Sequence, residues 1–145
     1  MCAIDPRLPA STSCNREESI YVDLWLLFPL GQAVNRMLTS NEPTPSWAAR
    51  LDRLFGATDW RKVFYQSSGQ ESLFSSEPEL QKVADFNAIG RYFVKRLESE
   101  FAAVADNPLP LFNSKNIPIY LLCFASANQK GSKTAIKIAD HILRQ

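Results

Sequence analysis

Four polar side chains in this sequence have the chemistry to bind a small anionic group. Asn35 and Arg36 follow the Pro29–Gly31 break, which comes directly after an apolar run. Asn128 follows the second long apolar run, and Asp5 stands in the short N-terminal segment MCAIDP. An arginine can clamp a carboxylate or phosphate through its fork of N–H donors, and asparagine amides can orient the same group. We therefore predict a substrate-binding site formed by Asp5, Asn35, Arg36 and Asn128.

Two of these residues also have a structural interpretation, which the sequence leaves open. Arg36 could form an ion pair with Asp23 or Asp52 instead of binding a ligand. Asp5, which we interpret as the remnant of an acidic loop, could instead belong to a frayed chain terminus.

The other reactive side chains give little support for catalysis. His141 is the only histidine and has no Ser or Cys partner in an identifiable motif, so we interpret it as a partly exposed side chain near a helix C-terminus. Cys123 lies inside an apolar run, where a packed, unreactive thiol is expected. The segment ANQKGSKT at 127–134 resembles a phosphate-binding loop, but both glycines of that motif are replaced. We interpret it as a solvated polar loop, with a weak anion site at the following helix start as the alternative.

Two apolar runs, Tyr21–Phe28 and Ile117–Ala125, organise the predicted fold. Neither run alternates cleanly between apolar and polar residues, which is typical of strands covered on both faces. Pro29 disfavours helix in the residue before it, and Gly31 allows a sharp turn. The sequence therefore predicts a central strand, a tight loop and a helix from about Gln32.

These two strands decide whether the candidate site can exist. Ligands of open α/β sheets bind outside the carboxyl ends of the strands. We expect the two strands to lie side by side with their exits at one rim of the sheet. That rim would bring Asn35 and Arg36 close to Asn128.

The remaining pattern predicts further helices, a linker and a hairpin. The long helix shows apolar residues at spacings of three and four, and the hairpin has the polar loop NSKN between two apolar arms. The predicted elements are a helix from Ser46 to Phe55, a short helix ending at Phe64, a linker over Gln66–Ser76, a long helix from about Pro78 to Ala105, a hairpin with Leu111-Phe112 and Ile117–Ala125 as its arms, and a last helix with Ala135, Ile138, Ala139 and Ile142 on its buried stripe.

Composition and charge exclude several classes of protein. The chain has 145 residues, 46% of them hydrophobic, which predicts one domain with its own core. The formal net charge is +1, so neither nucleic-acid binding nor membrane binding is supported. Cys2, Cys14 and Cys123 are widely spaced, which argues against a disulfide framework or a metal site. This cysteine usage and the lack of a signal-peptide pattern predict a cytoplasmic protein.

An ordered set of motifs resembles a known family. DLWLLFPLGQAVNRML, LDRLFGATDW and NSKNIPIYLLCFASAN follow one another, and an Ala/Ile-rich helix comes last. Together they resemble the C-terminal portion of the three-Cys-motif partner proteins, the TcmP family, from roughly Asp23 to the end of the sequence. MCAIDP is similar to that family's strand ending in Asp-Pro.

The resemblance implies an α/β fold: a partial Rossmann-like sheet of the methyltransferase type, with a C-terminal β-hairpin and covering helices. Residues 1–20 would be a strand remnant and an irregular segment, and residues 21–145 the C-terminal part of a single domain. The family's helix between these parts is replaced by RLPASTSCNREES. No G-x-G turn occurs here, so S-adenosylmethionine is expected to bind full-length relatives but not this chain alone.

The resemblance leaves two functions open. The chain would be a TcmP-like protein of unestablished activity, interpreted as the C-terminal part of a methyltransferase-related enzyme that lacks its cofactor-binding half and is inactive alone. The alternative is a non-catalytic interaction module that works with a three-Cys-motif protein. Few catalytic residues and the aromatic-rich helices over Trp47–Phe64 favour this alternative.

Overall fold

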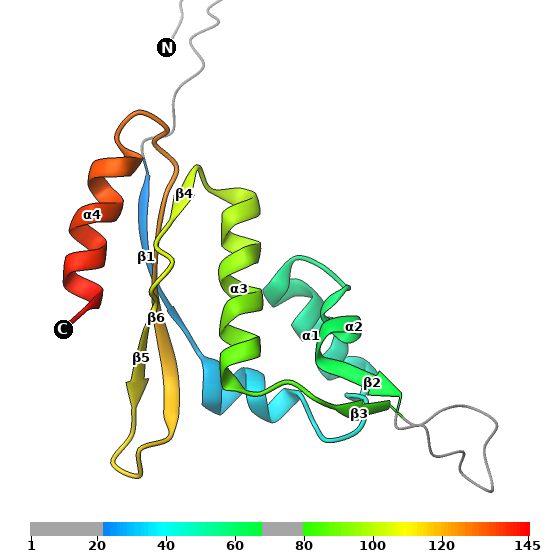
Figure 1. The fold of residues 1–145 in the computed structure, drawn as a ribbon. Coiled ribbons are helices and arrows are strands. Elements are labelled where there is room, and N and C mark those ends of the chain that lie inside the picture. Colours follow the sequence, from blue (N-terminus) through cyan, green and yellow to red (C-terminus); the bar gives the residue numbers. More distant parts are fainter. Residues whose placement is uncertain (1–21, 68–79) are drawn as a thin grey trace, which may run out of the picture.

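The computed structural model describes residues 22–67 and 80–145, which form a mixed α/β fold with helices on both faces of a four-stranded sheet (Figure 1). The strands are β1 (Asp23–Phe28), β2 (Tyr65–Ser67), β3 (Leu80–Lys82), β4 (Ala103–Val104), β5 (Leu109–Phe112) and β6 (Pro118–Ser126). The helices are the π-helical η1 (Leu30–Asn35), α1 (Pro45–Phe55), α2 (Trp60–Phe64), α3 (Phe86–Glu100) and α4 (Ser132–Leu143). The predicted α/β class is confirmed. Asp5 and the predicted N-terminal segment 1–20 lie outside the described residues.

The larger sheet is built around β6. β1 pairs with one edge of β6, while β4 and β5 pair with its other edge at different heights. β2 and β3 form a separate two-stranded sheet. Every strand pair among the described residues is antiparallel, so this part of the chain forms an open antiparallel sheet and a Rossmann-like arrangement is not confirmed.

The two apolar runs do lie side by side, but their exits do not share a rim. Asp23 pairs with Ser126 and Phe28 with Leu121, so β1 ends where β6 is near its start. At about 3.4 Å per residue, the two exits lie roughly 17 Å apart. The predicted shared rim is therefore wrong, because an apolar pattern specifies which residues are buried but not the direction of a strand.

The hairpin of β5 and β6 confirms the expected turn. Asn113 Oδ1 accepts hydrogen bonds from the N–H groups of Lys115 and Ile117, at 2.9 and 3.0 Å. The side chain of Asn113 thus satisfies N–H groups of the loop that have no partner strand, as is usual for asparagine in turns.

Helix α3 is shorter than the pattern predicts. The Asp85 side chain caps it by accepting from the Ala88 N–H at 2.7 Å, so the helix begins at Phe86. The residues before it pair as β3 with β2, which occupies the start of the predicted linker. After Glu100 the chain becomes extended and pairs with β6 as β4. At both ends of α3, pairing with another strand therefore replaces the helix that the apolar spacing predicts.

Large aromatic rings fill the side of the sheet that faces α3. Phe28 of β1 stacks on Phe93 of α3 with ring centroids 3.9 Å apart, and Phe55 meets Tyr92 edge-on at 5.1 Å. Trp60 and Phe64 are fully buried in the same core. The aromatic side chains of α1 and α2 that were expected to form an interaction surface therefore belong mainly to the core.

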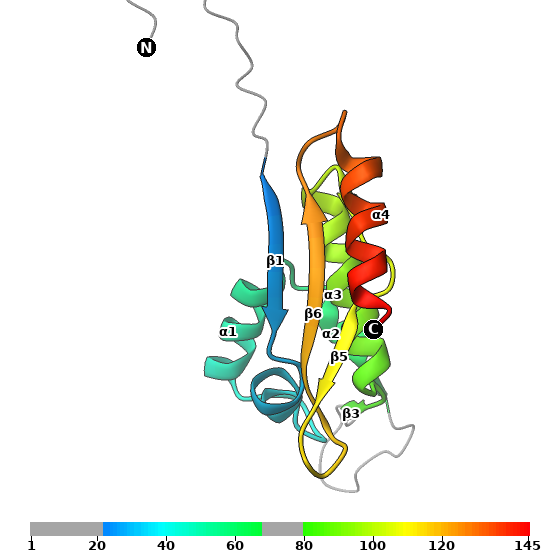
Figure 2. The same cartoon turned by 90° about the vertical axis from the view of Figure 1, so that its left-hand side faces the viewer.

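Helix α4 covers only part of the opposite side (Figure 2). Its Ala139 and Leu143 pack with Phe124 of β6 and Ala105 in a smaller core. β1 lies beside α4, not beneath it, so the expectation that β1 is covered on both faces is wrong.

Candidate functional site

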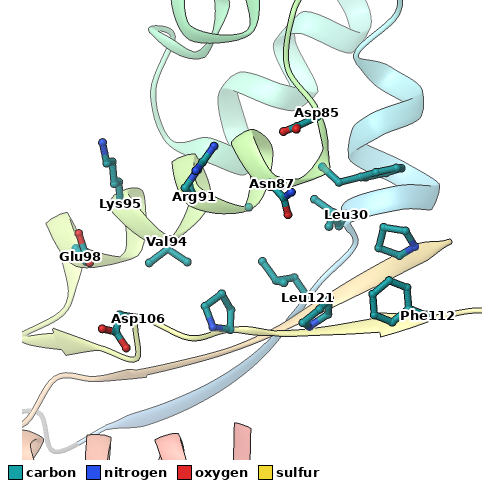
Figure 3. Close-up of a pocket in the computed structure, with 15 residues that line it drawn as sticks. Leu30, Asp85, Asn87, Arg91, Val94, Lys95, Glu98, Asp106, Phe112 and Leu121 are labelled. Carbon is teal, nitrogen blue, oxygen red and sulfur yellow. The ribbon is translucent and has the colours of Figure 1, made fainter. Parts of the chain in front are cut away.

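A groove of about 730 Å³ lies between α3 and the β5–β6 hairpin (Figure 3). This volume is in the range of small-molecule sites in proteins. Its lining comes from three places: the start of η1, one side of α3, and the hairpin with the segment before it. The lining residues are Leu30, Asp85, Phe86, Asn87, Gly90, Arg91, Val94, Lys95, Glu98, Asp106, Pro108, Pro110, Phe112, Pro118 and Leu121.

The floor of the groove is apolar. Val94 of α3 and Leu121 of β6 point toward one another across it, and Leu30 closes one end (Figure 3). Gly90 shapes this floor, because a Cβ there would lie 3.1 Å from Leu121 Cδ2. A side chain at position 90 would force the Leu121 side chain to shift and would occupy part of the floor.

The start of η1 is held against the hairpin by a second glycine. A Cβ on Gly31 would lie only 2.3 Å from the carbonyl oxygen of Pro118, so only glycine allows this approach. The predicted Pro29–Gly31 loop therefore does border the groove, through Leu30.

Polar side chains form the rim. Asn87 points toward the strands, whereas Arg91 and Lys95 point away from them and border the groove with their aliphatic stems (Figure 3). Asp106 lies on the strand side. Neither Arg91 nor Lys95 forms an ion pair within the described parts of the chain. The arrangement suits a ligand with an apolar body and a hydrogen-bonding group, since an amide such as that of Asn87 can donate and accept.

Asn35 and Arg36 lie outside this groove. Asn35 Oδ1 accepts a hydrogen bond from Lys82 Nζ at 2.6 Å, and burial lowers the pKa of Lys82. Arg36 is exposed. One alternative partner for Arg36 is occupied, because Asp52 pairs with Arg61 at 2.9 Å. Asn35 therefore joins β3 to η1, and a ligand role for Arg36 stays a prediction.

Asn128 lies at the opposite end of the sheet and serves its own loop. Its Oδ1 accepts from the N–H groups of Lys130 and Gly131, both at 3.1 Å. These bonds use amide donors that an anion would need at this helix start. The structure thus separates Asn128 from Asn35 and Arg36.

The remaining reactive groups occupy ordinary positions. Cys123 is buried, and desolvation raises the pKa of its thiol to about 12, which suppresses the nucleophilic thiolate. His141 is exposed in the last turn of α4. Over residues 22–67 and 80–145, no cluster of three or more His, Cys, Asp or Glu side chains could hold a metal ion.

The sequence did not predict the groove. Gly90 and Val94 stand one turn apart in a strongly patterned helix, and prolines recur at 108, 110 and 118. These signals mark a close helix–strand approach and a segment poor in N–H donors, but they do not say that the two meet.

The chain matches no family model, no curated protein and no solved structure. None of the helices described here is both long and apolar enough to span a membrane.

Proposed function

We propose that this chain is a binding unit whose groove between α3 and the β5–β6 hairpin holds an elongated, mainly apolar ligand. The observation that carries this proposal is the floor of Leu30, Val94 and Leu121 below a polar rim. Apolar surface supplies affinity in such sites, and a few polar groups orient the ligand. Asn87 is the group that would receive the ligand's hydroxyl or amide.

The resemblance to the three-Cys-motif partner proteins gives this unit a place in a larger activity. In a TcmP-like, methyltransferase-related protein the groove would be part of the substrate side, and S-adenosylmethionine would bind elsewhere. The direction of the strands supports this kinship: β1 and β5 both run antiparallel to β6 and are therefore parallel to each other. Doubly wound folds often carry one antiparallel strand in an otherwise parallel sheet.

A pair of variants on one hairpin tests the groove. Phe112 lines the groove and is 51% exposed, whereas Ile117 is 45% exposed and lies outside the lining. We expect Phe112→Ala to weaken binding of the neutral apolar dye Nile red about fivefold, the effect of losing about 1 kcal/mol of apolar contact. Ile117→Ala should leave the affinity unchanged. Equal effects of the two variants would contradict the proposed site.

The methyltransferase-related part of the proposal has its own test. S-adenosylmethionine is titrated by calorimetry into this chain and into a full-length TcmP relative. We expect heat of binding for the relative and none for this chain. A relative that gives no heat would remove the methyltransferase interpretation and leave the groove untouched.

A second candidate function is a non-catalytic interaction module that works with a three-Cys-motif protein. The groove follows α3 from Asp85 to Glu98, which at 1.5 Å per residue is roughly 20 Å. That length accommodates a peptide segment of several residues. Co-purification of the two proteins that Phe112→Ala reduces, and Ile117→Ala does not, would support this function. Unchanged co-purification of both variants would count against it.

A further inference from the structure

The rim of the groove between α3 and the β5–β6 hairpin carries its charges unevenly. Arg91 and Lys95 hold their cationic heads away from the strands and present only aliphatic stems to the groove (Figure 3). Glu98 and Asp106 lie at the same end of the groove, Glu98 on α3 and Asp106 on the strand side (Figure 3). Neither carboxylate forms an ion pair within residues 22–67 and 80–145. This end of the groove is therefore negatively charged.

The direction of α3 adds to this negative potential. Glu98 stands in the last turn of the helix, which contains no basic residue. The carbonyl groups at a helix C-terminus carry a partial negative charge, so a cation is favoured there and a carboxylate is not. Arg96 does not compensate Glu98, because its guanidinium pairs with Glu100 and donates to the carbonyl oxygens of Phe55 and Gly56.

The opposite end of the groove has a different character. Asp85 lies there, but its side chain already accepts from the Ala88 N–H at 2.7 Å as the cap of α3. The positive end of the helix dipole also offsets its charge. Asn87 is neutral, and Leu30 and Phe112 add apolar surface. The groove can thus orient a ligand by charge, with a cationic group at the Glu98 end.

We propose that the ligand of this groove is a cationic amphiphile, an alkyl chain that ends in a protonated amine. The ammonium group is held between Glu98 and Asp106, and the chain lies on Val94 and Leu121 and extends toward Leu30. An ammonium has three N–H donors, which two carboxylates on different elements can share. This inference rests on the proposed function, because it names the chemical class of the ligand that the groove binds.

Amphiphiles with other head groups fit these charges less well. A carboxylate head would meet carboxylates at both ends of the groove, while the heads of Arg91 and Lys95 lie outside it. A neutral alcohol has only the amide of Asn87 as its partner. An amine should therefore bind more tightly than an alcohol with the same chain, and the alcohol more tightly than a carboxylate.

Three probes with one chain length, decylamine, decanol and decanoate, test the inference on the full chain. Each is titrated by calorimetry at neutral pH, below its micelle-forming concentration. We expect decylammonium to bind about fivefold more tightly than decanol, the size expected from two exposed charge contacts, and decanoate to bind most weakly. The preference for the amine should shrink with added salt, because salt screens exposed charges.

Asp106→Asn and Glu98→Gln test the acidic end directly. Both side chains are exposed, so these variants should fold. Each should lower the affinity for decylammonium toward that for decanol and leave the affinity for decanol unchanged. Glu100→Gln is the matched control, since it removes the same charge from the same helix turn at a side chain outside the groove. It should keep the preference for the amine.

Failure of this inference differs from failure of the groove itself. Equal binding of decylammonium and decanol, or tightest binding of decanoate, would overturn the inference and leave the groove in place. It would also be overturned by a preference that survives both Asp106→Asn and Glu98→Gln, or that Glu100→Gln reduces as much as they do. If none of the probes binds, the groove and its cationic ligand are both wrong.

Discussion

The two faces of the large sheet are filled in different ways. On the α3 face, the rings of Phe28, Phe55 and Phe93 form a continuous core with α1 and α2. On the α4 face, the core is small, and Trp25 remains exposed next to it. The same strand, β1, supplies Phe28 to one face and Trp25 to the other. The comparison teaches that most of the buried core lies on the α3 face, while the α4 face of β1 keeps apolar side chains exposed.

The largest effect should come from removing the aromatic ring on the α3 face. We expect Phe28→Ala to lower the free energy of unfolding by about 3–5 kcal/mol, because it loses a buried ring and leaves a cavity. Trp25→Ala is the matched variant on the other face and should cost about 1 kcal/mol, since Trp25 is 43% exposed and its ring packs on Phe124 from one side of the sheet. Urea unfolding of the two variants measures the difference. Equal losses would remove the contrast between the faces.

A second comparison concerns the side chains that accept backbone hydrogen bonds near the N-termini of α3 and α4. Asp85 caps α3, and Asn128 accepts from the N–H groups of Lys130 and Gly131 in the loop that leads into α4. Replacing either with alanine should lower the free energy of unfolding by about 1 kcal/mol. A loss of that size at Asn128 indicates a structural role, whereas a stable Asn128→Ala variant would return this residue to the list of ligand-binding candidates.

The α3 side should also respond to acid. The hydrogen bond from Arg61, more than the one from Trp60, holds the pKa of Asp52 below its ordinary value of 3.8. A carboxyl whose pKa is lowered by folding stabilises the protein above the unfolded pKa, and this contribution is lost as the pH falls through the folded pKa. We expect Asp52→Asn to unfold more easily than the parent at neutral pH, with a smaller difference at about pH 3. A difference that stays constant with pH would contradict the ion pair with Arg61.

The smallest effect should be at the exposed flank of α4. Ile138→Ala should change the free energy of unfolding by less than about 0.5 kcal/mol at low protein concentration. Ile138 is 59% exposed, so its truncation removes little buried surface. Urea unfolding of the variant beside the parent measures the change, and a loss above about 1 kcal/mol would contradict the exposed position of this side chain.

Local sequence patterns predicted the helices and strands better than they predicted strand direction and packing. The loop NSKN between two apolar arms was enough to predict the β5–β6 hairpin, and the apolar runs identified both central strands. The direction of β1 relative to β6 has no signature in such runs. For this reason the proposed meeting of Asn35 and Asn128 was wrong, although each side chain does follow a strand.

Long-range partners explain what the sequence could not predict at the site. Asn35 meets Lys82, which is far away in the chain, and the groove exists only because α3 packs across the hairpin at Gly90. The exposure of Trp25 and Leu27 was also unpredictable, since a run such as LWLLF does not say how much of the sheet its helices cover.

The most direct test of the proposed groove is a chemical-shift map of the protein titrated with octanol, which has an apolar body and one hydroxyl. We predict that the shifted signals come from the amides of Gly90, Val94 and Leu121 and from the side-chain amide of Asn87. The indole signal of Trp25 and the methyl signals of Ile138 should stay in place. Shifts that gather at Trp25 and Ile138 and spare the floor of the groove would contradict the account.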